Sequence, residues 1–516
     1  MKGLGLIRRV NGPFAAVAMM AGIAAVAGSY LVAGSTPRFV VAPVASVLTT
    51  SMPGIIVTFG ILFLGDIGQK LNLGMAIGLT ILLASLLVTA GVLVGRRFRS
   101  RAITGLFPAL FVWLFANFLT GSPLYALGAA IPAAAVVAAG RQWLDAEDGH
   151  PAADVDGGRR TIVTGLVGLL GLGGLSYFLR DSVASDASTV DSEGSESSSD
   201  SEFSGHGDPH PLNDDLKAEA DEMIAAANEQ SLDVRRLEGL VSEKFYEVDI
   251  NSVNPTVEEG AWQLSVTGAV EQEVTVDYQE IRMMEAQHQF NTLRCVGESL
   301  NGRKMDNALW TGVPIMDVVD RANPQGEYVM LRADDGYFEE FPMDALKTGF
   351  LAYGMNGFEL PRAHGFPVRA LIPGHWGEIN VKWLTEIEIL DEEAKGYWEK
   401  RGWHGTGPVN TVAKLHATNI DSNNGVELGG HAYAGTRGIQ KVEVSIDGGE
   451  SWTEAELSDP LPGEDVWRMW AHRYDHPGKP HEVVVRATDG TGTLQPKDES
   501  RAFPSGATGW VSERIR

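Results

Sequence analysis

The chain of 516 residues contains a single cysteine, Cys295, whose side chain is well suited to bind a metal. A lone cysteine excludes an intrachain disulfide, a CxxCH haem site and an iron–sulfur cluster with four cysteine ligands. Its thiolate is a soft ligand that suits a sulfur-rich transition-metal site, and it must lose its proton to bind. The alternative is a small buried apolar residue. The residue type therefore allows one thiolate ligand and no more.

Six motifs, starting with the one that contains Cys295, occur in a fixed order. They are TLRCVG (residues 292–297), LAYGMNG (351–357), LPRAHGFPVR (360–369), VKWL (381–384), VEVSIDGGESW (442–452) and WRMW (467–470). Together they resemble the sulfite oxidase family of molybdopterin-dependent oxidoreductases, over residues 241–516. The last two motifs resemble the C-terminal dimerisation domain of that family.

The resemblance implies a site in which a pterin dithiolene holds molybdenum and Cys295 is the protein's ligand to the metal. His364, Arg369 and Lys382 match family positions that contact the phosphate and the ring of the pterin. Arginine can bind a phosphate through two hydrogen bonds, and Gly377 lets the loop approach closely. The alternatives are a surface salt bridge for Arg369 and a packed core histidine for His364. Four further cofactor contacts are implied, at Tyr246, Asp249, Asp335 and Asn380.

The sequence departs from the family at the catalytic tyrosine. That tyrosine lies in a segment similar to residues 397–404, where this chain has Trp403. An indole N–H can orient an oxyanion, but it cannot supply a phenolic proton. We therefore expect Trp403 and His404 to take part in catalysis, with Tyr397 as the alternative to His404.

The family's substrate-binding arginines are also absent from their expected positions. The first aligns with Val248 and the last with the turn at residues 506–509. An oxyanion substrate requires paired cations in its pocket. The remaining candidates are Arg294, Arg303 and Arg362, for which a structural or cofactor-binding role is the alternative.

The first 180 residues differ in composition from the rest. They contain 13 Lys+Arg and 6 Asp+Glu, a net charge of +7, whereas residues 181–516 carry −32. Their apolar stretches approach the ~20 residues that cross a bilayer, which predicts an α-helical transmembrane domain of about six helices over residues 1–180. The stretches are 14–34, 39–65, 73–94, 102–120, 123–140 and 161–179.

The positions of the arginines predict a multi-pass protein of the cell membrane. Arg-rich segments at 96–101 and 141–160 should face the cytoplasm, so residues after 180, including the catalytic domain, lie on the extracytoplasmic side. A re-entrant segment is the alternative for the stretch 39–65. Arg159 and Arg160 resemble a twin-arginine signal, with two ordinary cytoplasmic arginines as the alternative.

Composition and periodicity divide the remainder into three parts. Residues 181–240 are an acidic, Ser-rich linker followed by a helix over 212–240. In residues 241–410, short β-branched and aromatic runs alternate with turns and a few helical segments, which predicts an α+β domain. The resemblance assigns this domain to molybdopterin binding. Residues 411–516 predict an all-β immunoglobulin-like sandwich whose edges would form a homodimer. The acidity argues against nucleic acid as a partner and indicates a halophilic protein.

The resemblance implies oxygen-atom transfer by a membrane-anchored oxidoreductase. We expect a small sulfur-containing or oxyanion substrate, with oxidation of sulfite or a related sulfur compound as the leading hypothesis. Reduction of methionine sulfoxide or another S- or N-oxide is the alternative within the family. Two other classes are a non-enzymatic membrane-tethered module without its metal and a transporter. The expected redox partner is external: a copper protein, a cytochrome or a membrane subunit.

Overall fold

The computed structural model describes residues 12–60, 66–98, 101–140 and 210–516. The described residues form two compact units, whose main parts are residues 12–52, 66–98 and 101–140 in the first and residues 210–249 and 255–516 in the second. The predicted span at 161–179, the acidic part of the linker and the pair Arg159 and Arg160 lie outside the described residues.

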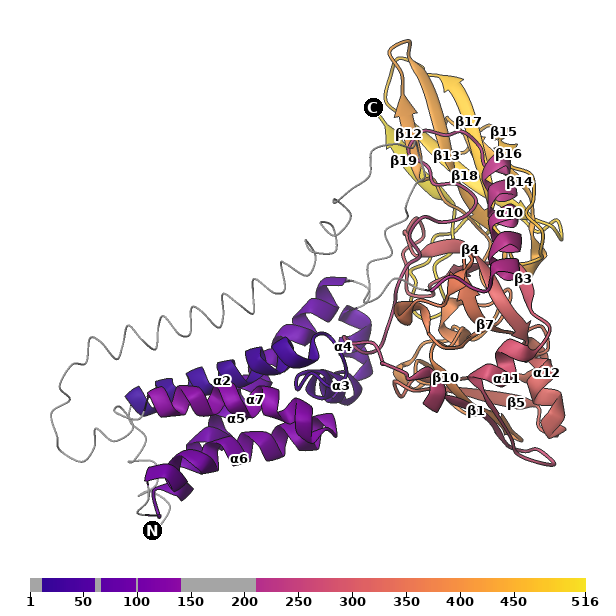
Figure 1. The fold of residues 1–516 in the computed structure, drawn as a ribbon. Helices are drawn as coiled ribbons and strands as arrows, with labels where there is room; N and C mark the ends of the chain where they lie inside the picture. Colours follow the sequence, from indigo (N-terminus) through magenta and orange to yellow (C-terminus); the bar gives the residue numbers. More distant parts are fainter. Residues whose placement is uncertain (1–11, 61–65, 99–100, 141–209) are drawn as a thin grey trace, which may run out of the picture. The chain divides into compact units, whose positions relative to one another are not determined.

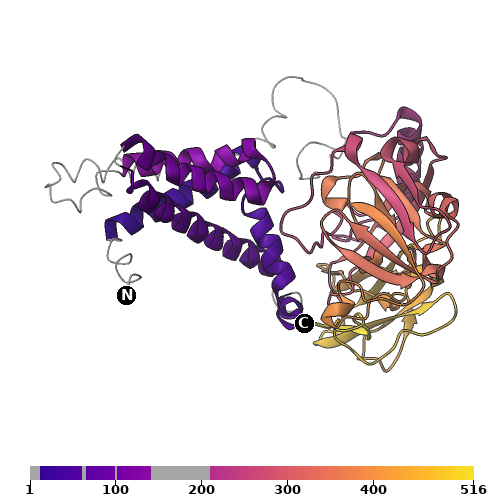
Figure 2. The ribbon, with the colours of Figure 1, turned by 90° about the horizontal axis from the view of Figure 1, so that it is seen from below.

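Four long helices of the described first unit pack side by side (Figure 2): α2 (Gly12–Ala33), α5 (Asp66–Gly95), α6 (Arg101–Thr120) and α7 (Pro123–Ala139). Helix α2 contacts α5 and α7, and α6 contacts the same two helices. A Cβ on Gly28 of α2 would lie 2.3 Å from the carbonyl oxygen of Gly128 in α7, so these backbones approach closely. Such small-residue crossings are common between helices in membranes.

The prediction of one span over residues 39–65 is wrong, because this stretch contains two short helices. They are α3 (Ala42–Ser51) and α4 (Gly54–Phe59), separated at Met52 and Pro53. Proline has no N–H for a helical hydrogen bond and disfavours helical geometry in the residue before it. Met52 is accordingly extended, with φ −69° and ψ 135°.

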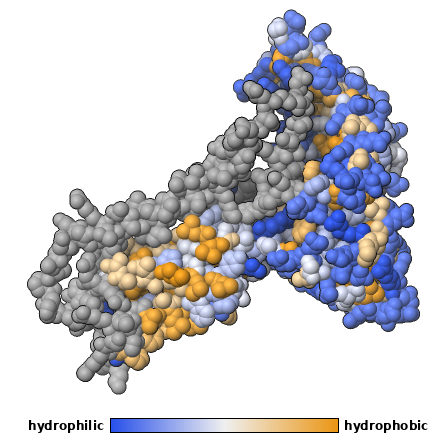
Figure 3. All heavy atoms as spheres, in the orientation of Figure 1, coloured by the Kyte–Doolittle hydropathy of each residue, from blue (hydrophilic) through white to orange (hydrophobic). Residues whose placement is uncertain are grey.

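Two described helices are long and apolar enough to cross a membrane, Phe14–Ala33 and Ile67–Gly95. Two more apolar helices are shorter, Leu106–Thr120 and Pro123–Ala139. On the face drawn in Figure 3, apolar side chains cover much of the first unit, and hydrophilic ones cover most of the second. The count of about six spans is therefore not reached within the described residues.

Beyond residue 209, the first helix of the second unit is α10 (Asp214–Gln230), which is shorter than the predicted helix over 212–240. The side chain of Asn213 caps its first turn by accepting from the Leu216 N–H at 3.0 Å. The helix ends at Ser231, which is extended. Leu240 then lies in the core of the unit, and its carbonyl accepts from the Trp467 indole at 2.8 Å. Pairing with the sandwich thus replaces the last predicted turns of helix.

The predicted α+β domain is confirmed as two sheets with short helices. One sheet has the order β2-β1-β10-β5-β6, and the other has the order β3-β4-β7-β8 with β9 paired to β7. The bounds are β1 (Gln263–Gly268), β2 (Val274–Asp277), α11 (Tyr278–Met283), β3 (Gln287–Arg294), β4 (Met305–Pro314), α12 (Met316–Val319), β5 (Tyr328–Ala333), β6 (Phe338–Pro342), α13 (Met343–Leu346), β7 (Phe350–Met355), β8 (Phe358–Glu359), β9 (Arg369–Leu371) and β10 (Leu384–Leu390).

The C-terminal part is all-β, as predicted. Two antiparallel sheets, β11-β13-β17-β16 with β12 on β13 and β15-β14-β18-β19, share one apolar core. Within this unit, strands β3 and β4 lie between the C-terminal strands and the sheet of β1, β10 and β5 (Figure 1). The bounds are β11 (Val412–Ala413), β12 (Ala417–Ile420), β13 (Gly425–Tyr433), β14 (Ile439–Ser445), β15 (Thr453–Glu454), β16 (Glu456–Leu457), β17 (Arg468–Asp475), β18 (His481–Asp489) and β19 (Val511–Ile515).

Trp467→Ala should destabilise the second unit strongly. The Trp467 ring is fully buried and stacks on His431 with ring centroids 3.8 Å apart. Its removal leaves a cavity and takes away one of the two hydrogen bonds to the Leu240 carbonyl, which keeps its bond from the Asn307 amide, at a cost of about 3–5 kcal/mol. Chemical denaturation followed by near-UV circular dichroism measures the change. Met283→Ala, at a side chain that is 77% exposed, should cost less than about 0.5 kcal/mol. A loss below about 1 kcal/mol for Trp467→Ala would contradict this packing.

Candidate metal centre

Cys295 follows the last residue of β3 and is only partly covered. Strand β3 pairs with β4, with Arg294 opposite Met305, and the Cys295 N–H donates to the Lys304 carbonyl at 2.9 Å. Residues 295–304, the cysteine loop, thus connect two paired strands. Burial, followed by the charge of Glu298, raises the pKa of the Cys295 thiol to about 11. A metal bound here must displace that proton.

A buried ion cluster lies next to Cys295. It consists of Arg294, Glu298 and Lys414. Glu298 Oε1 is 3.0 Å from Arg294 Nε and 2.5 Å from Lys414 Nζ. Glu298 Oε2 accepts from the Lys304 N–H at 2.9 Å. All three side chains are at most 2% exposed. Burial, followed by repulsion from Arg294, lowers the pKa of Lys414 to about 8.

The three arginine candidates for substrate binding have other contacts. Arg294 donates from Nη1 to the Asn410 carbonyl at 2.9 Å and from Nη2 to the Ala507 carbonyl at 3.2 Å, in addition to its bond to Glu298. Arg303 donates to the carbonyl of His416, and Arg362 donates to that of Pro255 at 2.6 Å. Arg294 therefore has a structural role, with its three nitrogens engaged within the protein.

The three predicted phosphate contacts lie near one another. Arg369 begins β9, in the same sheet as β3, and is 4% exposed. Its Nη1 donates to the His364 carbonyl at 3.2 Å and its Nη2 to the Asn380 carbonyl at 2.9 Å. Lys382 donates to the Ala363 carbonyl at 2.9 Å. Burial, followed by the charges of Lys382 and Arg369, lowers the pKa of His364 to about 3, so this imidazole is neutral.

Tyr246 and Asp249 join this group from the segment before β1. The Tyr246 N–H donates to Asp306 at 2.7 Å, and Asp249 pairs with Lys382. A Cβ on Gly377 would lie 2.6 Å from the Tyr246 hydroxyl, so the missing side chain at Gly377 makes room for this phenol. Burial, followed by the charge of Cys295, raises the pKa of Tyr246 well above 10, which keeps the phenol protonated.

Asn380 and Asp335 have local structural contacts. The Asn380 amide accepts from the Ile372 N–H at 2.7 Å and donates to the Trp376 carbonyl at 2.9 Å, so it fixes the loop between β9 and β10. Asp335, in the turn between β5 and β6, accepts from the Tyr337 N–H at 2.9 Å. Both remain predicted cofactor contacts, and their described bonds are to the backbone.

The predicted catalytic pair differs in burial. Trp403 is 1% exposed, lies edge-on to Phe503 with ring centroids 5.2 Å apart, and its Nε1 has no hydrogen-bond partner among the described residues. His404 is exposed, and its backbone N–H donates to the Pro504 carbonyl at 2.9 Å. Tyr397 is 3% exposed, and its hydroxyl likewise has no partner in the described part of the chain. Trp403 and Tyr397 therefore each hold an unused buried polar atom.

Sequence reasoning missed a group of buried carboxyls beside the segment that carries Trp403. A Cβ on Gly396 would lie 1.6 Å from Glu339 Oε1 and 2.6 Å from Glu399 Oε2, and one on Gly405 would lie 1.9 Å from Glu378 Oε1. Burial, followed by the charge of Glu399, raises the pKa of Glu378 to about 8. The signal in the sequence was weak, because these acids come from β6, the loop before β10 and the segment after it.

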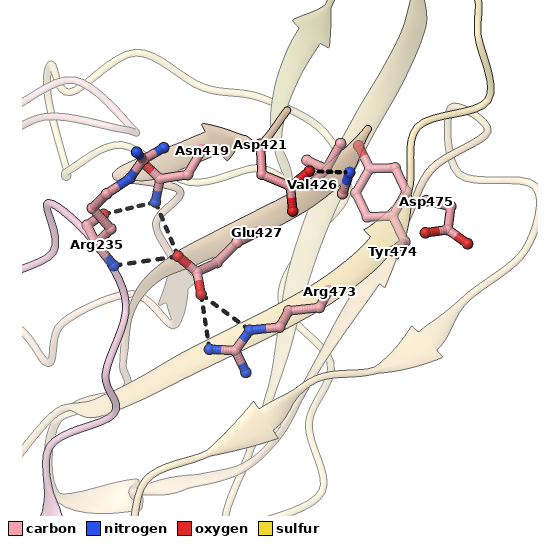
Figure 4. A pocket seen from close by; sticks show the side chains of 9 residues that line it. Arg235, Asn419, Asp421, Val426, Glu427, Arg473, Tyr474 and Asp475 are labelled. Atoms are coloured by element: carbon pink, nitrogen blue, oxygen red, sulfur yellow. Dashed lines mark hydrogen bonds and ion pairs between the residues drawn. The ribbon is translucent and has the colours of Figure 1, made fainter. Parts of the chain in front are cut away.

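A pocket of about 560 Å³ is lined by strands of the C-terminal sandwich and by Arg235 (Figure 4). Three of its polar side chains, those of Glu427, Arg473 and Asn419, are bonded to one another. Glu427 accepts from Arg473 at 2.8 and 3.0 Å and from Asn419 at 3.2 Å, and Asn419 donates to the Arg235 carbonyl at 2.7 Å. These contacts fasten the segment after α10 to strands β12, β13 and β17.

The residues around Cys295 fit a molybdenum–pterin group with an anionic phosphate. Arg369 is a buried cation whose two hydrogen bonds go to carbonyls, and its Nε has no partner among the described residues. A buried guanidinium with only carbonyl acceptors and one unbonded N–H is stabilised by a nearby anion. The thiol of Cys295 supplies one soft donor atom. The charges of Cys295 and Arg369 both influence the pKa of Tyr246, so this tyrosine lies near both residues.

Two protein families and several known proteins are similar to this chain. Residues 251–398 match the family described as "Oxidoreductase molybdopterin binding domain", and residues 408–508 match "Mo-co oxidoreductase dimerisation domain". An "Uncharacterized oxidoreductase YuiH" of Bacillus subtilis (strain 168) is 31% identical over 150 residues, which cover 28% of this chain and 74% of that relative. "Sulfite oxidase, mitochondrial" of Rattus norvegicus is 27% identical over 307 residues, which cover 47% and 54%. The solved sulfane dehydrogenase SoxCD from Paracoccus pantotrophus has 19% identity and a TM-score of 0.48, covering 55% of this chain and 82% of that chain.

The chain belongs to the sulfite oxidase family of molybdopterin-binding oxidoreductases, and its second unit carries both the cofactor-binding and the dimerisation domain. It spans about half the length of the curated sulfite oxidase of the rat, with 54% covered.

Glu378→Gln should make the protein's stability less dependent on pH. The folded-state pKa of Glu378 is raised from 4.5 to about 8, so its contribution is fully present below about pH 4.5 and is lost as the pH rises through 8. The variant should match the wild type near pH 5 and exceed it by about 1–4 kcal/mol near pH 9, at ~1.4 kcal/mol per pKa unit.

Melting temperatures across this pH range measure the effect. Glu482→Gln, at an exposed carboxyl, should follow the wild-type profile and controls for the loss of one acid. Parallel pH profiles for Glu378→Gln and the wild type would show that Glu378 ionises normally.

Proposed function

We propose that this protein is a membrane-anchored molybdopterin-dependent oxidoreductase that transfers an oxygen atom at a small sulfur compound, with oxidation of sulfite or a related compound as its activity. The observation that carries the proposal is that Tyr246 lies close enough to interact with both the lone Cys295 and a buried Arg369, whose Nε has no partner among the described residues. The similarity to proteins named sulfite oxidase supports the substrate class.

Each residue of the site has a definite task in this proposal. Cys295 holds the metal, and Arg369, neutral His364 and Lys382 bind the phosphate and ring of the pterin. The bound molybdenum–pterin group supplies the two-electron change that oxygen-atom transfer requires. The buried Trp403 N–H donates to an oxygen of the substrate, and the Tyr246 hydroxyl remains protonated and acts as a donor.

Reduction of a neutral S-oxide is the second candidate, and a specific observation favours it. Arg294 donates from Nε to Glu298 and from its other two nitrogens to carbonyls, so its nitrogens are engaged within the protein rather than directed at an oxyanion. A sulfoxide oxygen needs one hydrogen-bond donor rather than paired cations, and Trp403 Nε1 can supply it.

The wider assembly is part of the same proposal. The apolar helices Phe14–Ala33 and Ile67–Gly95 support a membrane anchor, with the catalytic domain outside the cell. The match to a dimerisation domain supports a homodimer through an immunoglobulin-like sandwich. We propose that electrons pass to a separate copper protein, cytochrome or membrane subunit.

Purified full-length protein tests the proposal directly. Metal analysis should find one molybdenum per chain, and sulfite should reduce an artificial electron acceptor. If sulfite is inert and reduced viologen is oxidised by methyl sulfoxides, the second candidate replaces the first. Protein without molybdenum and without either activity would support a non-enzymatic module.

Cys295→Ser should lower turnover by at least about 100-fold, because a hydroxyl is a harder and weaker donor than a thiolate. Steady-state kinetics on samples of measured molybdenum content separate slower chemistry from lost metal. Glu482→Gln, at an exposed carboxyl, serves as the unaffected control. Wild-type turnover in Cys295→Ser would mean that the thiolate is not a ligand.

A further inference from the structure

The cysteine loop is bonded along much of its length to residues 410–416, which we call the clasp segment. Asn301 exchanges two hydrogen bonds with the backbone of Leu415, at 2.8 and 2.9 Å. Lys414 donates to the Gly302 carbonyl at 2.9 Å, and the His416 ring lies 3.1 Å from the same oxygen. These bonds connect positions more than 110 residues apart in the sequence. The clasp segment contains β11, the first strand of the C-terminal domain, so that domain contacts the loop that carries the candidate metal ligand.

Glu298 is the point at which these contacts converge. Its Oε1 accepts from Lys414 of the clasp segment and from Arg294 at the end of β3. Its Oε2 accepts from the Lys304 N–H at the far end of the cysteine loop. A single buried carboxylate therefore connects the start of the loop, its end and the C-terminal domain.

The backbone passes this constraint to Cys295. Lys304, held by Glu298, accepts through its carbonyl from the Cys295 N–H at 2.9 Å. The Glu298 N–H in turn donates to the Cys295 carbonyl at 3.3 Å. The N–H of Cys295 is thus bonded to Lys304, which Glu298 holds, and the carbonyl of Cys295 is bonded to Glu298 itself. Removing a buried ion's partner leaves an uncompensated charge, so a change at Glu298 cannot be absorbed locally.

We propose that Glu298 is a positioning residue that, together with Lys414, fixes the sulfur of Cys295, so that the C-terminal domain orders the metal-ligand loop in addition to any role in dimerisation. The inference rests on the proposed role of Cys295 as the metal ligand.

Because Cys295 is the chain's only cysteine, its reactivity reports on the loop without background. The metal-free full-length protein is labelled with a maleimide, and the rate is compared among variants of measured melting temperature. Lys414→Met should accelerate labelling by at least about five-fold, because the loop opens more often and the loss of a nearby cation cannot favour the reactive thiolate. Glu298→Gln should accelerate labelling at least as much, since it opens the loop and also removes a negative charge near the thiol. Asn301→Ala, at the exposed edge of the loop, leaves the ion cluster in place and should accelerate it by at least about two-fold.

Glu443→Gln is the matched control. Glu443 is paired with Arg486 at 3.1 Å in the sandwich, and its side chain is 15% exposed. This control should label at the wild-type rate. Smaller accelerations than those given, or an equal acceleration in Glu443→Gln, would overturn the proposal. If Glu298→Gln does not fold, Asn301→Ala against Glu443→Gln decides.

The molybdenum-loaded protein provides a readout that lost stability alone would not move. Glu298→Gln should shift the Mo(V) electron paramagnetic resonance signal, and Glu443→Gln should leave it unchanged. An unchanged signal in Glu298→Gln would overturn the proposal for the loaded state. Labelling requires neither metal nor substrate, so failure of the proposed activity and failure of this proposal are distinguishable.

Discussion

Three charged side chains, Arg294, Glu298 and Lys414, are buried together behind the chain's only cysteine. Charges that leave water need partners, and here the partners come from β3, the cysteine loop and the segment that enters the C-terminal domain. Arg294 also donates to Asn410 and Ala507 of that domain. The cluster therefore connects the cofactor-binding and C-terminal domains within one compact unit, and it fixes the loop that carries Cys295.

The phosphate side of the site follows the same physical rule. Arg369 is buried with two carbonyl partners, His364 is neutral because burial and two neighbouring cations disfavour its charge, and Lys382 pairs with Asp249. This collection of buried donors is costly without an anion, which is the reason that a phosphate-bearing cofactor fits it. The site thus contains two groups of charged side chains. In one, Arg294 and Lys414 are bonded to Glu298, and in the other, Arg369 has an N–H without a partner among the described residues that can bind a ligand.

Much of the fold could be predicted from local patterns, and the errors have local causes. The α+β and all-β domains follow from short β-branched runs and Asp-Gly turns. One predicted span fails at Met52 and Pro53, where proline breaks the helix, and α10 stops at Gln230 because the chain beyond it pairs with the sandwich. Family motifs predict Cys295, His364 and Arg369 as residues of the site. They did not reveal that all three nitrogens of Arg294 are engaged within the protein, because two of the acceptors come from 116 and 213 residues away.

The central claim is that Cys295 is the protein's ligand to molybdenum in a site ordered by Glu298. Molybdenum K-edge X-ray absorption of the purified protein tests it most directly, because sulfur and oxygen neighbours are distinguished by their scattering and distance. We predict that Cys295→Ser loses one sulfur neighbour of the metal relative to the wild type and keeps the remaining ones. An unchanged number of sulfur neighbours in Cys295→Ser would contradict the account.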